Sequence, residues 1–171
     1  MKRIIALPKI TDECQKAFEK CPVNVTRTML TGGTEITNRF LDYGLTFGDG
    51  TLSDNIREGI ILRVAYNVKC PYEVLHHLPL AIKAGISEHD LEALKKAMPS
   101  DERLSAAVHY ADIILSKGVS DAESFSRLTK YFSQKEIVYI TLLIGHYLMS
   151  AIFINNCGVE MDRAPVEDLY K

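Results

Sequence analysis

The sequence predicts an all-α fold, a bundle of roughly seven to nine helices around a central apolar helix. Apolar residues recur at helical spacing, as at Ile56, Ile60 and Val64, while charged residues take other positions of the same segment. No segment alternates apolar and polar residues between hairpin turns, as a half-buried strand would. Short clusters of Gly, Pro, Ser and Asp separate the periodic segments, which indicates a series of helices joined by turns.

The first third of the chain contains three predicted helices. The first covers Lys9 to Lys20, and two shorter ones follow around Val23 to Met29 and Thr34 to Tyr43. The run Phe47-Gly48-Asp49-Gly50 ends this part, because glycine and aspartate favour turns.

Two further helices are predicted on either side of Cys70. The first runs from Asp54 to about Lys69. Pro71 begins the second, because proline at the first helical position loses no useful donor and its fixed φ suits a helix. Gly85 is a natural left-handed end for it.

The remaining helices are each predicted from a capping residue at the start or a glycine at the end. One helix opens at Ser87-Glu88-His89-Asp90, another begins at Ser100 or Asp101 and reaches Lys117-Gly118, and the capping box Ser133-Gln134-Lys135-Glu136 precedes a long apolar helix that Gly158 closes.

The apolar helix could be either a membrane span or a buried helix, because Ile137 to Ile154 is a stretch of 18 residues without Asp, Glu, Lys or Arg. That length reaches the threshold for a candidate membrane span. The stretch also contains polar residues such as His146 and Ser150, and no basic cluster flanks it. We therefore expect a central helix that other helices or a partner subunit bury, and no membrane.

Composition favours one globular domain over residues 1–171. Of the 171 residues, 47% are apolar and 25% are charged. The 20 basic and 22 acidic residues give a formal net charge of −2, and they form no run of like charges. Nucleic acid is therefore not an expected partner.

The cysteines indicate reduced thiols in a cytoplasm. No two of Cys14, Cys21, Cys70 and Cys157 have the spacing of a zinc knuckle or a dithiol motif, so no metal or other cofactor is expected. The apolar stretch within Met1 to Leu7 is too short for a secretory signal.

The segment that starts at Cys70 carries the candidate chemistry. Cys70, Glu73 and His77 are separated by three and four residues, a spacing that places side chains on one face of a helix. At the N-cap, the helix dipole would favour a thiolate at Cys70, and Glu73 could hydrogen-bond His77 and raise its basicity. The structural alternative is a solvated Glu–His pair beside a small buried cysteine.

A family resemblance adds to this motif. Glu58, followed after twelve positions by Cys70 and then by Glu73 and His77, resembles the core signature of the carboxymuconolactone decarboxylase / alkylhydroperoxidase D family. The similarity extends over residues 1 to about 162, and the text that matches includes Arg57-Glu58-Gly59-Ile60-Ile61-Leu62-Arg63-Val64-Ala65, His76-His77-Leu78-Pro79-Leu80-Ala81, Ala84-Gly85-Ile86-Ser87 and Leu143-Ile144-Gly145-His146-Tyr147.

The resemblance implies an alkylhydroperoxidase D-like helical fold and a homo-oligomer, a trimer or hexamer, with a dimer also possible. It also implies a contact between Glu58 and His77. That contact does not follow from a simple hairpin, in which Glu58 would lie about 18 Å from the turn and His77 about 10 Å. Glu73 stands where peroxidase members carry the cysteine that attacks the peroxide, and in this respect the motif resembles the decarboxylase branch.

Three functions remain open from the sequence. The leading one is an enzyme that uses Glu58, Cys70, Glu73 and His77 for proton transfer on a small carboxylated or carbonyl-bearing substrate. The second is a thiol peroxidase that acts through Cys70. The third is a non-catalytic helical binding or scaffold subunit.

The other candidate residues have weaker support. Tyr72 and His146 are possible pocket residues, although His146 is also expected as a hydrogen-bonded core histidine. His76 is expected to face away from the pocket of His77, His89 and His109 to lie at the surface, and Cys14, Cys21 and Cys157 to serve packing.

Overall fold

The computed structural model describes residues 5–96 and 98–166, and this part of the chain is helical without a strand. The predicted features at Met1 to Leu7, and the ends of the expected 1–171 domain, lie partly outside it. Its elements are α1 (Asp12–Lys20), α2 (Asn24–Met29), the 3₁₀ helix η1 (Leu30–Gly32), α3 (Thr34–Thr46), α4 (Asp54–Asn67), α5 (Pro71–Lys83), α6 (Glu88–Ala93), α7 (Glu102–Lys117), α8 (Ala122–Thr129) and α9 (Gln134–Cys157).

The capping residues explain most of the helix boundaries. The side chain of Asp101 accepts a hydrogen bond from the backbone of Leu104 at the start of α7, and Ser133 forms the expected capping box at the start of α9. Gly118 and Gly158 end these two helices with φ values of 74° and 65°. The predicted all-helical fold is therefore present, with η1 and α8 as elements that the sequence patterns did not reveal.

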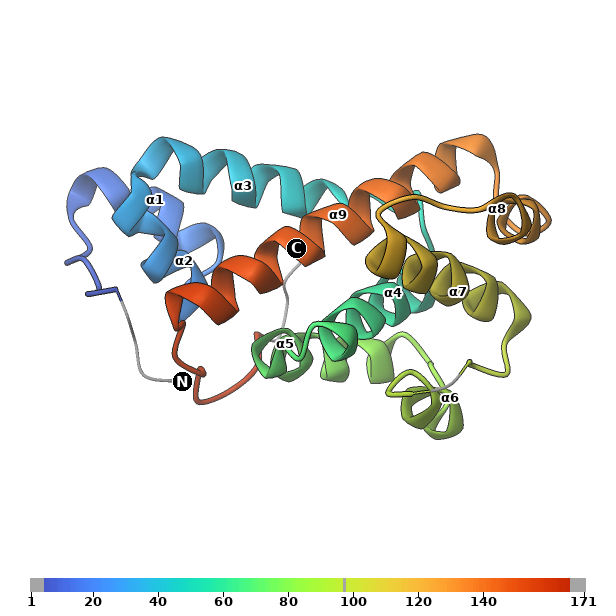
Figure 1. The fold of residues 1–171 in the computed structure, drawn as a ribbon. Helices are drawn as coiled ribbons and strands as arrows, with labels where there is room; N and C mark the ends of the chain where they lie inside the picture. The colour runs from blue at the N-terminus through green and yellow to red at the C-terminus, as the bar shows by residue number, and fades with distance from the viewer. Residues whose placement is uncertain (1–4, 97, 167–171) are drawn as a thin grey trace.

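Helix α4 is the most deeply buried helix of the described chain. Residues 56–65 are all buried, and α4 packs against α5, α7 and α9 (Figure 1). A side-chain Cβ at Gly59 would lie only 2.4 Å from Cδ1 of Leu104, so glycine permits the close approach of α4 and α7. Arg57, Glu58 and Arg63, predicted on other faces of α4 than the apolar residues, are buried too, and Arg63 pairs with Asp112 at 2.7 Å.

Helix α9 runs across the molecule from the α8 end to the α2 end (Figure 1). It is long and apolar enough to meet the criteria for a membrane span, and 50% of its most apolar window is buried inside the protein. The buried face contacts α4, α7 and α8. The opposite face exposes Val138, Leu142, Met149 and Ile152, so the other helices enclose only one side of α9.

Helices α2 and α3 cover the middle of α9 through side chains. The rings of Phe40 and Tyr43 on α3 lie 4.6 and 5.3 Å from the ring of His146 on α9. The segment that follows α9 returns to α2, where the backbone N–H of Asn24 donates to Asp162 Oδ1 at 3.1 Å. These contacts surround a pocket between α2, α3, α5 and α9.

Candidate active site

His77 lies between two carboxylates in the interior of the protein. Its Nδ1 donates to Glu58 Oε2 at 2.7 Å, and its Nε2 lies 3.4 Å from Glu73 Oε2. All three side chains are almost fully buried. Glu73 and His77 are one turn apart on α5, whereas Glu58 reaches them from α4. The spacing of the motif therefore explains one half of this triad, and the packing of α4 on α5 supplies the other.

The two ends of the triad have further partners. Arg57 Nε donates to the second oxygen of Glu58 at 2.9 Å, and Arg57 also pairs with Asp54 at 2.7 Å. At the other end, Ser150 Oγ donates to Glu73 Oε1 at 2.5 Å. A continuous polar chain thus connects Arg57 on α4 with Ser150 on α9 through the interior.

This arrangement favours an imidazolium between two carboxylates. Burial alone would lower the pKa of His77, but the carboxylates of Glu58 and Glu73 outweigh it and raise the pKa to about 9. Burial alone would raise the pKa of Glu73, but hydrogen bonds and charge from His77, with the Ser150 hydroxyl, lower it. At neutral pH, Glu73 is therefore ionised and His77 is protonated.

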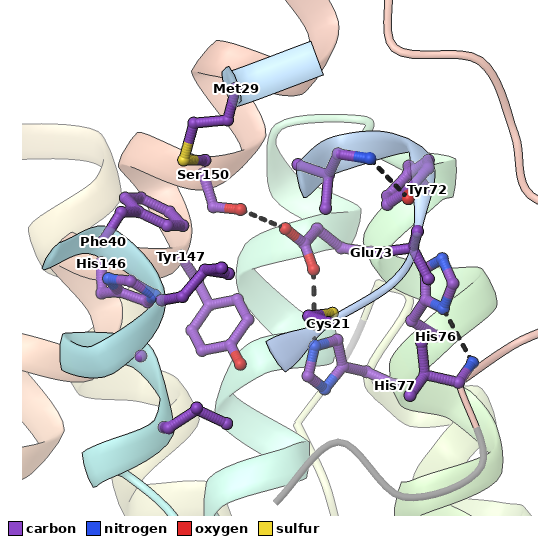
Figure 2. Close-up of a pocket in the computed structure, with 16 residues that line it drawn as sticks. Cys21, Met29, Phe40, Tyr72, Glu73, His76, His77, His146, Tyr147 and Ser150 are labelled. Carbon is purple, nitrogen blue, oxygen red and sulfur yellow. Dashed lines mark hydrogen bonds and ion pairs between the residues drawn. The ribbon is translucent and has the colours of Figure 1, made fainter. Parts of the chain in front are cut away.

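Glu73 is the member of the triad that reaches the pocket together with His77 (Figure 2). The empty space amounts to about 660 Å³ including open solvent at its mouth. Apolar side chains from α2 and α3 form the opposite wall, among them Val25, Phe40 and Leu41. Glu58 lies behind His77 and does not line the pocket.

Cys70 does not join this cluster. It is the N-cap of α5 as predicted, but its side chain is buried among Tyr72, Ala151 and Ile154 and does not line the pocket. Burial raises the pKa of its thiol to about 11, and the nearby N–H groups of the helix start do not offset this. The predicted thiolate is therefore wrong, because the dipole effect is smaller than the desolvation penalty.

A different cysteine lines the pocket. Cys21 precedes α2 and borders the cavity near Tyr72 and His76. Burial raises the pKa of Cys21 to about 11 as well, against the smaller opposing effect of the nearby Thr26 side chain. Both buried thiols are therefore protonated at neutral pH.

Tyr72 and His76 line the pocket and are connected to the segment after α9 (Figure 2). The Tyr72 hydroxyl donates to Asp162 and accepts from the backbone N–H of Val25 at 3.0 Å. His76 Nε2 donates to Asp162 at 3.2 Å, and His76 Nδ1 accepts from the backbone N–H of Val166 at 3.0 Å. His76 therefore faces the same pocket as His77, contrary to the sequence-based expectation.

His146 also lines the pocket, between the rings of Phe40, Tyr43 and Tyr147. The expected hydrogen-bonded core histidine is not found: Nδ1 is buried without a hydrogen-bond partner among the described residues. Burial lowers the pKa of His146 to about 4, so its ring is neutral. A Cβ at Gly44 would lie 2.8 Å from His146 Nε2, so glycine gives the ring its room.

The remaining histidines lie away from the pocket. His89 is exposed on α6, and His109 is half-buried on α7. Among the residues that sequence patterns did not indicate, Ser150 had a usable signal, since it lies four positions after His146 on the same apolar helix. Cys21 and Asp162 had none, because they reach the site through loops. No group of three or more His, Cys, Asp or Glu side chains in residues 5–96 and 98–166 is arranged to hold a metal ion.

Comparisons with known proteins agree with this fold. A model described as the carboxymuconolactone decarboxylase family matches residues 34–113. An alkylhydroperoxidase AhpD core structure, an uncharacterized peroxidase-related protein from Ralstonia eutropha JMP134, is similar with a TM-score of 0.76 and 17% identity over 98% of this chain and 94% of that chain. No curated protein matches the sequence.

The debrominase Bmp8 is similar as well. A variant in complex with 2,3,4-tribromopyrrole has a TM-score of 0.76 and 15% identity over 95% of both chains. The apo form has a TM-score of 0.74 and 15% identity over 94% of this chain and 93% of that chain. At these identities the structures show the shared fold, and the predicted alkylhydroperoxidase D-like architecture is confirmed.

Proposed function

We propose that this protein, whose residues 34–113 match the model of the carboxymuconolactone decarboxylase family, is an enzyme that transfers protons on a small carboxylated or carbonyl-bearing substrate. Glu73 acts as the base and acid that contacts the substrate. His77 pairs with Glu73 on the side away from the substrate, and Glu58 is the second counter-ion of His77.

One observation supports this proposal above the others: an ionised carboxylate borders an apolar pocket with an imidazolium directly behind it. Glu73 has one oxygen on Ser150 and the other near His77, which restricts its orientation. A general base requires this combination of a fixed position and access to the substrate. The apolar walls strengthen electrostatic effects on the reacting atoms.

The reaction begins when Glu73 takes the proton from a carbon next to the substrate carbonyl. The electron pair of the broken C–H bond moves toward the carbonyl oxygen and gives an enolate, while the proton remains on Glu73. The imidazolium of His77 keeps Glu58 as its counter-ion while the negative charge moves from Glu73 to the enolate. Return of the proton to another carbon gives an isomer.

Loss of CO₂ from a carboxylated substrate would use the same residues, with Glu73 as the proton donor instead of the proton acceptor. The C–C bond breaks, its electron pair remains on the substrate carbon, and that carbon receives a proton from Glu73 after His77 has supplied it. Both routes use Glu73 beside His77, the second route also uses a proton that His77 supplies, and neither route requires a thiol.

Deuterium exchange tests the proposal directly. The protein is incubated in D₂O with a panel of small cyclic ketones and β-keto acids, and proton NMR follows the carbon-bound hydrogens and the loss of CO₂. We expect catalysed exchange or CO₂ release with some members of the panel. A protein that accelerates neither reaction for any member would contradict the proposal and favour the non-catalytic binding subunit.

The peroxidase alternative can be separated by the behaviour of Cys70. Because its thiol is buried and protonated, we expect alkylation by iodoacetamide at pH 8 to be slower at Cys70 than at the half-buried Cys157, as measured by mass spectrometry. We also expect Cys70→Ser to keep proton-transfer activity, because serine is a favoured N-cap residue. Rapid alkylation of Cys70 together with hydroperoxide turnover would instead support a peroxidase.

We also propose that the partner of α9 is a second copy of the chain. Its exposed apolar residues Val138, Leu142, Met149 and Ile152, together with Gly145, follow the alternating four-and-three spacing of a coiled-coil seam. Apart from its two neighbours and the backbone of α9 itself, no described atom lies within 4 Å of a Cβ built at Gly145, so another helix can approach closely there.

We therefore expect Leu142→Glu to shift the protein toward the monomer in sedimentation velocity, because it places a charge in the centre of the seam. Val119→Glu is the matched control, since Val119 is exposed outside α9. The proposal is wrong if the wild type is monomeric or if both variants assemble like the wild type.

A further inference from the structure

The charges around the pocket select among the substrates that the proposed function allows. Among the described residues that line it, none is Lys or Arg, and Glu73 is the carboxylate that borders the empty space. The guanidinium of Arg57, next to Glu58 on α4, is directed to Glu58 and Asp54, and none of these three residues lines the pocket. The described lining therefore offers a negative charge and no free cation.

The two histidines beside Glu73 do not change this balance. The imidazolium of His77 already has Glu58 and Glu73 as counter-ions on its two nitrogens. His76 accepts the backbone N–H of Val166 at Nδ1, which requires a neutral ring, and burial lowers its pKa against the opposing effect of Asp162. Neither imidazole is left to pair with an anionic ligand.

An anionic ligand would consequently lose its hydration beside an ionised carboxylate without gaining a counter-ion. Like charges at such distances repel each other, and an unpaired charge in an apolar site is costly. A neutral ligand avoids both costs and buries apolar surface against Val25, Phe40 and Leu41.

On the opposite side of the pocket, His146 favours a ligand with a polar atom that can pair with its ring. The neutral ring of His146 has an Nδ1 without a partner among the described residues, and a buried polar atom in this state is uncommon. The ring lies within 4.6 to 5.5 Å of Phe40, Tyr43, Phe47 and Tyr147, measured between ring centroids. Of these four rings, Phe40 and Tyr147 line the pocket beside His146, and aromatic side chains of this kind suit a flat ligand.

We propose that the pocket takes a small, flat, neutral and mostly apolar ligand with an enolisable carbonyl, and that it discriminates against carboxylate-bearing compounds of the same size. This inference rests on the proposed function for the role of Glu73 and narrows it to proton transfer on a neutral carbonyl compound, without loss of CO₂. The proton moves from the carbon next to the carbonyl to Glu73, and the electron pair stays on the ligand as the enolate.

Binding of matched compounds tests the inference without relying on turnover. The probes are acetophenone, benzamide and benzoate, of which the last two differ mainly in charge. Methyl chemical shifts of Val25, Leu41 and Val166 report binding at this pocket by NMR at pH 7. We expect both neutral probes to bind at least about tenfold more tightly than benzoate, a factor that one unpaired charge easily supplies.

The variant Glu73→Gln removes the charge and keeps the size of the side chain. In this variant we expect benzoate to gain affinity until it approaches benzamide, with little change for benzamide itself. Glu88→Gln, on the exposed start of α6, is the control and should leave all three affinities unchanged. Should the Glu73→Gln variant prove unfolded, the ratio of benzamide to benzoate affinity in the wild type decides alone.

The inference is overturned if benzoate binds as tightly as benzamide in the wild type, if the discrimination persists in Glu73→Gln, or if none of the probes shifts the pocket methyl signals. Failure of the proposed function has a different signature. In that case the neutral probes bind with the expected preference, but the protein does not accelerate deuterium exchange in acetophenone.

Discussion

Replacing Glu73 by Gln is expected to lower the rate of proton transfer by about 10²–10⁴-fold, the usual contribution of a positioned general base. An amide cannot take the substrate proton, although it can still accept from the Ser150 hydroxyl. The measurement is the rate of deuterium incorporation next to the carbonyl of the best ketone in the panel, followed by NMR. The loss should appear in kcat more than in KM, since the amide keeps the shape of the pocket.

The control for this experiment is Glu88→Gln, which changes the same atoms on an exposed helix start. Circular dichroism of both variants should resemble that of the wild type, whereas Glu73→Gln should unfold at a lower temperature than Glu88→Gln because it removes a buried counter-ion of His77. If Glu73→Gln kept full activity while Cys70→Ser abolished it, the roles assigned to the two residues would have to be exchanged.

The largest effect on stability is expected for Glu58→Gln. Glu58 is fully buried and is the counter-ion of both Arg57 and His77. Its replacement leaves these cations without that charge, and the loss of one member of a buried ion pair typically costs about 3–5 kcal/mol in the free energy of unfolding. Urea unfolding at pH 7 measures this change, with Glu88→Gln as the neutral comparison. A change within that of the control would contradict the structural role of Glu58.

The same variant should alter the pH dependence of stability. The pKa of His77 is raised from 6.5 to about 9 in the folded protein. Below the lower value the imidazole is charged in both states, and the stabilisation is fully present. As the pH rises toward 9, the unfolded chain releases its proton first, so the free energy of unfolding falls. We expect this fall in the wild type and a smaller one in Glu58→Gln, because the pKa of His77 loses its strongest raising influence.

Local signals in the sequence predicted the helices well, because capping residues and glycines act within a few positions. The capping box at Ser133 and the left-handed ends at Gly118 and Gly158 all mark real boundaries. Helix α8 was missed although Asp121 caps it, because it is short and follows no long apolar pattern. How deeply each helix is buried could not be predicted from local sequence, because α9 is the more apolar helix and yet α4 is buried on all sides.

The meeting of Glu58 and His77 shows why the candidate site was only partly predictable. Helical spacing placed Glu73 beside His77, but the position of Glu58 depends on how far α5 is shifted along α4. That shift is determined by the loop at residues 68–70, in which Lys69 has a φ of 53°, a left-handed conformation that lysine seldom adopts. The residue types of this loop do not indicate a left-handed conformation at Lys69. The contact between Glu58 and His77 was therefore predicted from the resemblance to a known family.

Cys70 and His146 illustrate a second limit, which concerns the surroundings of a residue. The helix start at Cys70 was predicted correctly, but the ionisation of its thiol depends on the apolar cluster around it. His146 was expected to satisfy its ring nitrogens in the core, whereas the rings of Phe40, Tyr43 and Phe47 and the space at Gly44 isolate it. Such environments arise from segments distant in the sequence.

The carboxylate of Asp162 also determines the order in which the molecule can assemble. It binds Asn24, Tyr72 and His76, which precede it by 138, 90 and 86 positions. By contrast, α4 and α5 are neighbours in the chain and close only a short loop. Contacts of long sequence separation form after the entropy of closing large loops has been overcome. The helical scaffold can therefore precede the pocket during folding, and the ligand site becomes complete only when the segment after α9 has packed against α2 and α5.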